Sequence, residues 1–191
     1  MKGWLNRWRR RVVQALLFRR VFGERSQGLW LPHTRISPST CIEHAEKLVL
    51  ADHVFIGHFC FIDASQGVTL DEGVQITSHV AIVSHSSHRA LRLLGRAYVE
   101  QHGVPPGYVA APVRIGAYSF IGPHSVVEAG TTLGRGSLVR AGSVVRGAFP
   151  DFAVLAGNPA VVVGDTREGD AKWLAEHPDL RANYDAWARN E

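Results

Sequence analysis

Two histidines in a short polar run are the side chains of this chain that are best suited to proton transfer. His85 and His88 lie in the run Ser84-His85-Ser86-Ser87-His88. Histidine ordinarily titrates close to neutral pH, so it can take up and return a proton during catalysis. The run is therefore a candidate site of general base catalysis. His85 is the candidate base, and His88 could orient it, contact an acceptor or face solvent.

This run opens a long segment in which a six-residue pattern stops. The pattern is absent for about thirty residues between Ile82 and Val113. Long excursions from a regular scaffold are frequently functional. The sequence Pro105-Pro106-Gly107 indicates a shaped loop rather than a disordered one. The regular elements on either side must therefore hold the candidate base in place.

The six-residue pattern itself is the strongest signal in the chain. An apolar residue recurs at every sixth position, and a small residue stands four places after each of the first five. These residues are Ile115, Ile121, Val127, Leu133, Val139 and Val145, with Ser119, Ser125, Thr131, Ser137 and Ser143. The same phase appears upstream at Ile36, Ile42, Leu50, Ile56, Ile62, Leu70, Ile76 and Ile82. A period of six fits neither a helix nor a simple strand, but it fits a strand and a corner repeated three times per coil. The pattern predicts a solenoid of stacked coils with aliphatic residues inside.

The repeat resembles that of the bacterial hexapeptide-repeat transferases over roughly residues 36–163. The resemblance implies an all-β solenoid, a left-handed parallel β-helix, and a homotrimer with active sites at subunit interfaces. In the maltose and galactoside acetyltransferases of this family, a similar histidine is followed by a second one and then by a Leu-Arg pair. His85, His88 and Leu91-Arg92 match that spacing. The resemblance implies that His85 is the catalytic base and that the loop reaches over a neighbouring subunit's active site.

The same resemblance implies candidate residues for the two substrates. The asparagine that helps related enzymes to hold the acceptor has no match here, so Asp63 is the candidate in its place, together with Arg92. The segments resembling the family's coenzyme A groove contain Phe120, Gly122, Ala141, Gly142, Arg146, Asn158 and Pro159. Small residues would let the pantetheine arm lie along the coil, and arginine would meet phosphate. Acetyl-CoA is the expected cosubstrate, and no metal is expected.

Other reactive side chains have less specific explanations. Cys60 occupies a small-residue position of the repeat, which predicts a buried structural thiol. His58 and His124 occupy variable positions and are expected to face outward. Some β-helix relatives, the γ-class carbonic anhydrases, bind zinc with three histidines, and His58, His85 and His88 make this an alternative. The short step from His85 to His88 does not reproduce that family's spacing.

The first 25 residues form a separate basic segment. They carry eight Lys or Arg against one Glu, whereas the whole chain has a net charge of +4. The rest of the chain is therefore slightly acidic, which excludes a globally basic nucleic-acid binder. The arginines alternate with apolar residues at helical spacing, namely Trp4, Leu5, Trp8, Val12, Leu16, Leu17 and Phe22. This amphipathic pattern predicts either attachment to an anionic membrane surface through residues 1–25 or a helix docked on the protein.

Composition restricts the class of protein. The chain has 191 residues, 46% hydrophobic and 20% charged, which is typical of one folded domain. Two cysteines cannot form a disulfide framework, so a cytoplasmic location is expected, with a peripheral position on the inner membrane face if the tail binds lipid.

These observations predict that the chain has three segments and that the protein is an acyltransferase. Residues 1–30 are the basic amphipathic segment, 31–163 the β-helix with a protruding loop at about 86–112, and 164–191 a C-terminal helical cap. The expected activity is acetyl transfer from acetyl-CoA to a carbohydrate hydroxyl, in surface polysaccharide or glycan biosynthesis. The alternatives are N-acetylation of an amino sugar, a non-catalytic scaffold and a zinc protein.

Overall fold

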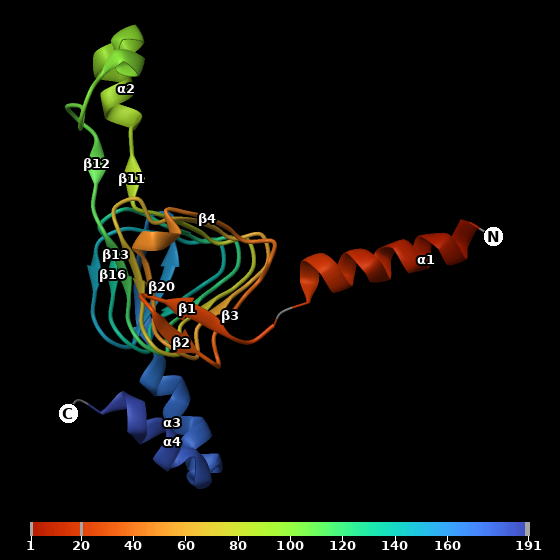
Figure 1. Ribbon diagram of the computed structural model, residues 1–191. Helices are drawn as coiled ribbons and strands as arrows, with labels where there is room; N and C mark the ends of the chain where they lie inside the picture. Colours follow the sequence, from red (N-terminus) through yellow and green to blue (C-terminus); the bar gives the residue numbers. More distant parts are fainter. Residues whose placement is uncertain (1, 20, 190–191) are drawn as a thin grey trace.

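Three sheets form the sides of a coiled chain (Figure 1). The computed structural model describes residues 2–19 and 21–189. Each coil contributes a strand in turn to a first, a second and a third face, and the strands stacked within a face are parallel, apart from the final pair β20–β21. This arrangement is a parallel β-helix, as the repeat predicted.

The strands are short because each spans one side of the coil. The first face contains β3 (Arg35–Ile36), β6 (Phe55–Ile56), β9 (Gln75–Ile76), β14 (Phe120–Ile121), β17 (Leu138–Val139), β20 (Ala153–Gly157) and β21 (Ala160–Asp165). The second contains β4 (Cys41–Glu43), β7 (Phe61–Asp63), β10 (Ala81–Val83), β15 (Val126–Val127) and β18 (Val144–Val145). The third contains β5 (Leu48–Leu50), β8 (Val68–Leu70), β13 (Val113–Ile115), β16 (Thr132–Leu133) and β19 (Ala148–Phe149).

The six-residue repeat builds the core because it places the aliphatic residue of each coil directly on the aliphatic residue of the next. On the first face the register pairs Ile36 with Ile56, Ile56 with Ile76, and Ile76 with Ile121. The last three of these side chains are fully buried. The small residues of the repeat are buried too, and their hydroxyls satisfy backbone groups: Ser125 donates to the Arg140 carbonyl at 3.1 Å and accepts from the Ser143 amide at 3.3 Å. Cys60 is 2% exposed, so the prediction of a buried thiol is confirmed.

The corners between the faces position the side chains that matter for function. The first corner, between the third and first faces, includes His53 and Tyr118, and the second, between the first and second faces, includes His79 and His124. All four have a left-handed backbone. Gly73 also lies at the first corner with φ +69°, where a Cβ would approach the Tyr118 ring to 2.6 Å. The third corner, between the second and third faces, is where the repeat is interrupted.

An arm leaves the third corner (Figure 1). Its base is an antiparallel pair, β11 (His85–Ser86) with β12 (Val109–Ala110). Its tip carries α2 (His88–Leu94) and a 3₁₀ segment (Gly95–Glu100). A second 3₁₀ turn at this corner spans Ala45–Lys47. The interruption of the repeat is thus an ordered projection.

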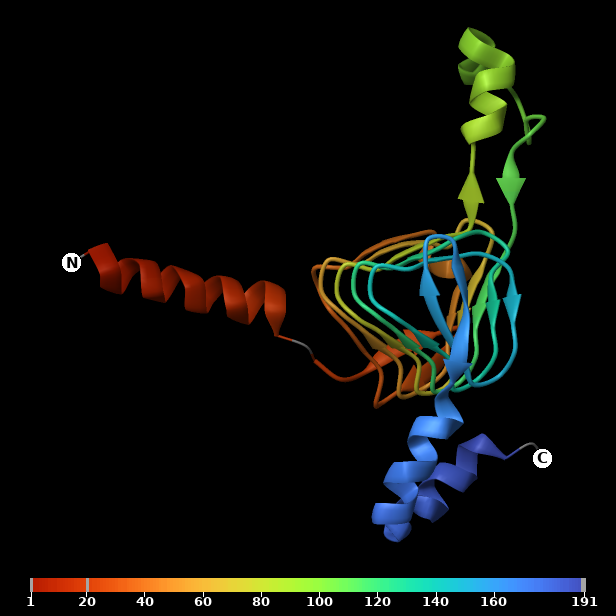
Figure 2. The same ribbon diagram turned by 180° about the vertical axis from the view of Figure 1, so that it is seen from behind.

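Both ends of the coil carry additional elements. At the N-terminal end, α1 (Lys2–Val13) and a π-helical turn (Gln14–Phe18) project away from the coils (Figures 1 and 2). A hairpin of β1 (Glu24–Ser26) and β2 (Leu29–Leu31) follows, and its Ser26 hydroxyl accepts from the Leu50 amide at 2.8 Å. The helix therefore ends before Phe22, which the amphipathic pattern had included.

The C-terminal segment is helical, as its spacing indicated. It consists of α3 (Thr166–Glu176), a 3₁₀ turn (Pro178–Leu180) and α4 (Arg181–Ala188). Trp187 stacks on Tyr118 at the first corner, with ring centroids 4.8 Å apart. Leu174 is buried, whereas Trp173 is 63% exposed.

Candidate active site

His85 stands where the second face ends and the arm begins. It directly follows Ser84, the residue after β10, and it is the first residue of β11. The strand before it pairs with β7 of the preceding coil, so that Val83 lies beside Asp63. This register brings the Asp63 carboxylate next to the imidazole, with Asp63 Oδ2 2.5 Å from His85 Nδ1. A carboxylate and a histidine that are 22 positions apart in the chain thus form one unit.

Asp63 is buried and fully engaged by hydrogen bonds. Its side chain is 2% exposed, against 35% for His85. The Ser65 amide donates to Oδ1 at 2.9 Å, while the Ser84 amide and hydroxyl lie 3.2 and 3.3 Å from Oδ2. Burial pushes the pKa of Asp63 upward, but the hydrogen bonds from Ser65 and His85 outweigh it and hold this pKa below its ordinary value. The carboxylate is therefore ionised at neutral pH.

This carboxylate fixes the orientation of the imidazole. An ionised carboxylate only accepts hydrogen bonds, so the proton shared with it belongs to His85 Nδ1. The Ser65 hydroxyl lies 3.0 Å from the same nitrogen. Tyr108 from the arm stacks on the ring, with centroids 5.4 Å apart and planes 16° apart. The remaining nitrogen, Nε2, is left with a lone pair, as a general base requires.

A hollow of about 140 Å³ opens beside the imidazole. Three coils, both strands of the arm and the start of α2 line it with Val83, His85, Ser86, His88, Val109, Glu128, Ala129 and Arg146. His88 is oriented by the Ser86 hydroxyl, which lies 2.7 Å from its Nδ1. Two histidines, a carboxylate and a guanidinium thus share one small polar site at the third corner.

A larger hollow of about 490 Å³ lies between residues of the arm and Gln66, and it includes Tyr108, which stacks on His85. Its lining combines two aromatic rings and two amide side chains with backbone and small apolar groups: Gln66, Tyr98, Val99, Gln101, Gly103, Val104, Pro105 and Tyr108. The Gln66 amide donates to the Ser84 hydroxyl at 2.9 Å, which connects this hollow to the hydrogen bonds around Asp63.

The expected cofactor residues do not gather around His85 within one chain. Arg146 does line the small hollow. Phe120 lies on the first face, and Gly122, Ala141 and Gly142 lie at the second corner. Asn158 and Pro159 form the turn between β20 and β21. The second face separates all of these residues except Arg146 from the third corner.

Gly122 also has a structural reason to be glycine. A Cβ at this position would lie 2.5 Å from the Ala141 amide nitrogen of the next coil. Gly142, by contrast, has φ +72° and open space around it. The two glycines therefore need separate explanations.

The two residues that were expected to bind the acceptor substrate do not line the hollows beside His85. Asp63 was expected to face the acceptor, but it is buried beneath His85. Arg92 is exposed on α2 and is not among the residues that line either hollow. The sequence did not indicate Glu128 or the stacking of Tyr108, since both depend on how coils and arm lie in space.

The three histidines considered above as zinc ligands do not meet within one chain. His58 lies at the second corner and His85 at the third, so one chain does not bring them together. His85 Nδ1 is already bonded to Asp63.

Comparison with known proteins agrees with the fold. Residues 112–147 match the family described as bacterial transferase hexapeptide (six repeats). The probable acetyltransferase Rv3034c of Mycobacterium tuberculosis is 47% identical over 76 residues, which are 40% of this chain and 25% of that protein. The putative lipopolysaccharide biosynthesis O-acetyl transferase WbbJ of Escherichia coli is 29% identical over 61% of this chain and 59% of that protein. The chain thus covers less than two thirds of the length of either relative.

A solved structure shares the architecture. The galactoside acetyltransferase in complex with coenzyme A superimposes with a TM-score of 0.54 at 24% identity, over 71% of this chain and 63% of that one. The matched repeat, the stacked parallel coils and this likeness agree on one fold: residues 112–147 carry the bacterial transferase hexapeptide repeat, and the chain forms a left-handed parallel β-helix.

Proposed function

We propose that this protein transfers an acetyl group from acetyl-CoA to a carbohydrate hydroxyl, with His85 as the general base. The observation that carries the proposal is the buried Asp63 carboxylate bonded to His85 Nδ1, beside an open polar hollow. Relatives named as acetyltransferases support the same reaction class.

The chemistry needs one proton carrier and no covalent enzyme intermediate. His85 Nε2 takes the proton from the acceptor hydroxyl as its oxygen attacks the thioester carbonyl carbon. The tetrahedral intermediate then collapses, the C–S bond breaks, and the proton passes from Nε2 to the departing sulfur. The products are an acetyl ester and coenzyme A with a free thiol. Because a thioester is already activated, a single addition and elimination suffices.

Asp63 acts in this scheme as a positioning residue. Its carboxylate holds the proton on Nδ1 and stabilises the imidazolium that forms when Nε2 is protonated. Ser65 and Ser84 keep the carboxylate in place. His88 is the second candidate catalytic residue, since it lines the hollow that His85 faces.

The cofactor would be bound by a different part of the coil. The second corner offers an edge of small residues, Gly122, Ala141 and Gly142, near Phe120 and the Asn158-Pro159 turn. Since the second face separates this edge from His85, one chain does not complete the site. A homotrimer in which the His85 corner of one subunit meets the second corner of its neighbour would complete it. Arg146 lies on the histidine side and would reach a coenzyme phosphate across that interface.

The acceptor would occupy the larger hollow, which residues of the arm and Gln66 line. Tyrosine rings suit the apolar face of a sugar, and the amides of Gln66 and Gln101 suit its hydroxyls. The name of the WbbJ relative refers to lipopolysaccharide biosynthesis, which supports an acceptor of the surface-glycan class.

The helix α1 would attach the enzyme to an anionic membrane surface. Trp4, Trp8 and Leu16 are 67%, 54% and 69% exposed, so the apolar side of this segment has little cover within the chain. The helix has no acidic residue in its first turn, and its last turn contains Arg10 and Arg11. Each base close to an anionic surface contributes about 1 kcal/mol of attraction. In the described part of the chain, no helix has the length and apolar character needed to cross a bilayer.

The acetyl-transfer proposal is tested by acceptor-dependent release of free thiol from acetyl-CoA over a panel of sugars and oligosaccharides. His85→Ala should lower the rate by about 10² to 10⁴, while His102→Ala, which changes a histidine of the arm outside both hollows, should not. Turnover that survives in His85→Ala would exclude this residue as the base. Matched amino sugars separate N-acetylation from O-acetylation, and failure to bind acetyl-CoA would favour a scaffold.

The membrane proposal is tested by co-sedimentation with vesicles. Phosphatidylglycerol vesicles should capture the full chain, and neutral phosphatidylcholine vesicles should not. Deleting residues 1–19 leaves β1 intact and should abolish capture. If the deletion changes the oligomer size and leaves lipid binding unaltered, the segment packs on a neighbouring subunit instead.

A further inference from the structure

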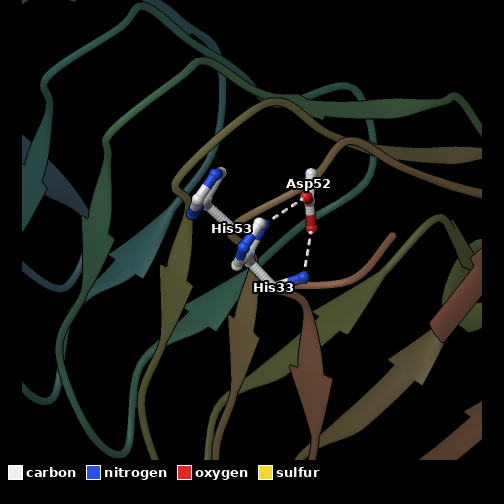
Figure 3. Close-up of side chains that lie close together, drawn as sticks. All are labelled: His33, Asp52 and His53. Atoms are coloured by element: carbon white, nitrogen blue, oxygen red, sulfur yellow. Dashed lines mark hydrogen bonds and ion pairs between the residues drawn. The ribbon is translucent and has the colours of Figure 1, made fainter. Parts of the chain in front are cut away.

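Two histidines and an aspartate meet at the first corner, away from the proposed active site (Figure 3). His33 lies in the turn before β3, and Asp52 and His53 lie in the equivalent turn of the next coil, before β6. The register that pairs β3 with β6 stacks these two turns. The cluster therefore follows from the coil geometry, although the chain positions are 19 and 20 apart.

The three side chains are close and nearly aligned. The His33 and His53 rings are stacked, with centroids 4.5 Å apart and planes 3° apart. Asp52 Oδ2 lies 2.9 Å from His33 Nδ1. One potential ligand atom from each residue lies within 4.8 Å of the other two. This is the only such group of three among the residues that the structure describes.

Asp52 is held as an ionised ligand. Its Oδ1 accepts from the His33 amide at 2.9 Å and from the Thr34 hydroxyl at 3.1 Å. Partial burial raises the pKa of Asp52, but hydrogen bonds from the His33 ring and from backbone amides hold it well below its ordinary value. The carboxylate is thus fixed by the backbone on one oxygen, while the other faces the imidazoles.

We propose that His33, Asp52 and His53 bind a divalent transition metal, with Zn²⁺ as the ion that best suits the set. Two imidazoles and one carboxylate, with water as a fourth ligand, make a tetrahedral zinc site. Zinc ligands bind at about 2.0–2.2 Å, so the side chains must close by a modest amount from their present separation. They are free to do so, because His33 and His53 are exposed. Zinc takes the place of the proton between His33 and Asp52.

A second histidine pair provides an internal comparison. His79 and His124 stack at the second corner, with centroids 4.8 Å apart and planes 8° apart. No aspartate, glutamate or third histidine completes a three-ligand group there, within the described ranges 2–19 and 21–189. Stacking alone therefore does not define the site, and the carboxylate is what distinguishes the first corner.

The ion would fasten the first coil to the second. It would link the turn after the β1–β2 hairpin to the corner before β6, at the open N-terminal end of the solenoid. Because His85 is at the third corner, zinc here would stabilise the fold and leave acetyl transfer unchanged. The proposal is thus independent of the catalytic one.

The experiment is a zinc titration of the full chain without an affinity tag, first treated with chelator and then dialysed. Competition with a chromophoric chelator gives the affinity, elemental analysis gives the stoichiometry, and thermal unfolding gives the stabilisation. We expect one zinc per chain, a higher Tm with zinc than with chelator, and thiol release that is the same in both.

Matched variants identify the ligands. His53→Asn suits the test, because asparagine tolerates the left-handed backbone at φ 61°. His79→Asn is the control, since His79 has φ 62° and also belongs to a stacked pair. Zinc affinity should fall at least tenfold in His53→Asn and in Asp52→Asn and stay unchanged in His79→Asn. Absence of stoichiometric zinc in the full chain, or equal weakening in His53→Asn and His79→Asn, would overturn the proposal.

Discussion

The proposed base depends on a carboxylate that stays ionised although it is buried. Asp63 keeps its charge because Ser65, Ser84 and His85 donate to it, while Tyr108 covers the imidazole from the arm. A neutral amide in place of this carboxylate could not stabilise the imidazolium, and it could donate to Nδ1 and select the wrong tautomer. Replacing Asp63 by asparagine should therefore slow the catalytic step without weakening substrate binding.

Asp63→Asn measures this effect. We expect kcat to fall at least tenfold, with the KM for acetyl-CoA little changed, because the proposed cofactor edge belongs to the neighbouring subunit's second corner and Asp63 is buried beneath His85. Steady-state kinetics across pH 5–9 are the measurement. If the variant instead formed less folded oligomer and bound acetyl-CoA more weakly, while kcat per folded site stayed the same, the role of Asp63 would be structural only.

The same carboxylate predicts a pH dependence of stability. A carboxyl group whose pKa is lowered in the folded state stabilises that state above its unfolded pKa, about 3.9, and this contribution disappears as pH falls through the folded pKa. The free energy of unfolding of the native protein should therefore exceed that of Asp63→Asn at pH 7 and approach it in acid. Urea unfolding at several pH values tests this. A difference that grows toward low pH would contradict the assignment.

The sequence indicated His85 as a candidate base, but it did not indicate that Asp63 is bonded to it. The histidine lies in a local motif and at a break in the repeat, both of which are visible along the chain. Contact between residues 63 and 85 depends on the number of residues per coil, and this coil is longer because Ile62 and Leu70 are separated by two residues more than the repeat requires. The sequence did not indicate the His33–Asp52–His53 cluster either, because its contacts also depend on how consecutive coils stack.

At the scale of elements, the repeat encodes the faces but not the projections. The aliphatic and small positions were predicted to point inward, and Ile121 and Ser125 are 0% exposed. The arm and the β1–β2 hairpin have no repeat to reveal their pairing, so the sequence indicated only where the pattern stops. Glycines inside the repeat are ambiguous in sequence, because tight packing and cofactor access both favour a missing side chain.

Gly122→Ala and Gly142→Ala separate these two reasons. The Cβ at position 122 would meet the backbone of the next coil, so we expect a loss of about 2–3 kcal/mol in the free energy of unfolding. At position 142 only the left-handed backbone opposes alanine, for about 1 kcal/mol. Denaturant unfolding measures both. If Gly122→Ala were as stable as the native protein, the packing explanation would be wrong, and cofactor access would be the better reason for that glycine.

At the scale of the whole molecule, the candidate residues form two half-sites that face different directions. The third corner holds His85, His88 and Arg146, while the second corner and the first face hold Gly122, Ala141 and Asn158. Folding of one chain keeps these half-sites apart, because the rigid second face lies between them. In the proposed mechanism, association between chains joins the candidate base to the candidate cofactor edge.

Mixed assemblies test this directly. His85→Ala removes the base, and Ala141→Trp, at an exposed position, blocks the cofactor edge. Each variant alone should be inactive. Coexpression with two different tags, followed by purification on both, yields trimers that contain both variants. Around a cyclic trimer of either composition, one junction joins an intact His85 corner to an intact second corner, so activity should return to about a third of the native value. If both half-sites belonged to the same chain, every site would carry one defect and the mixed assemblies would stay inactive.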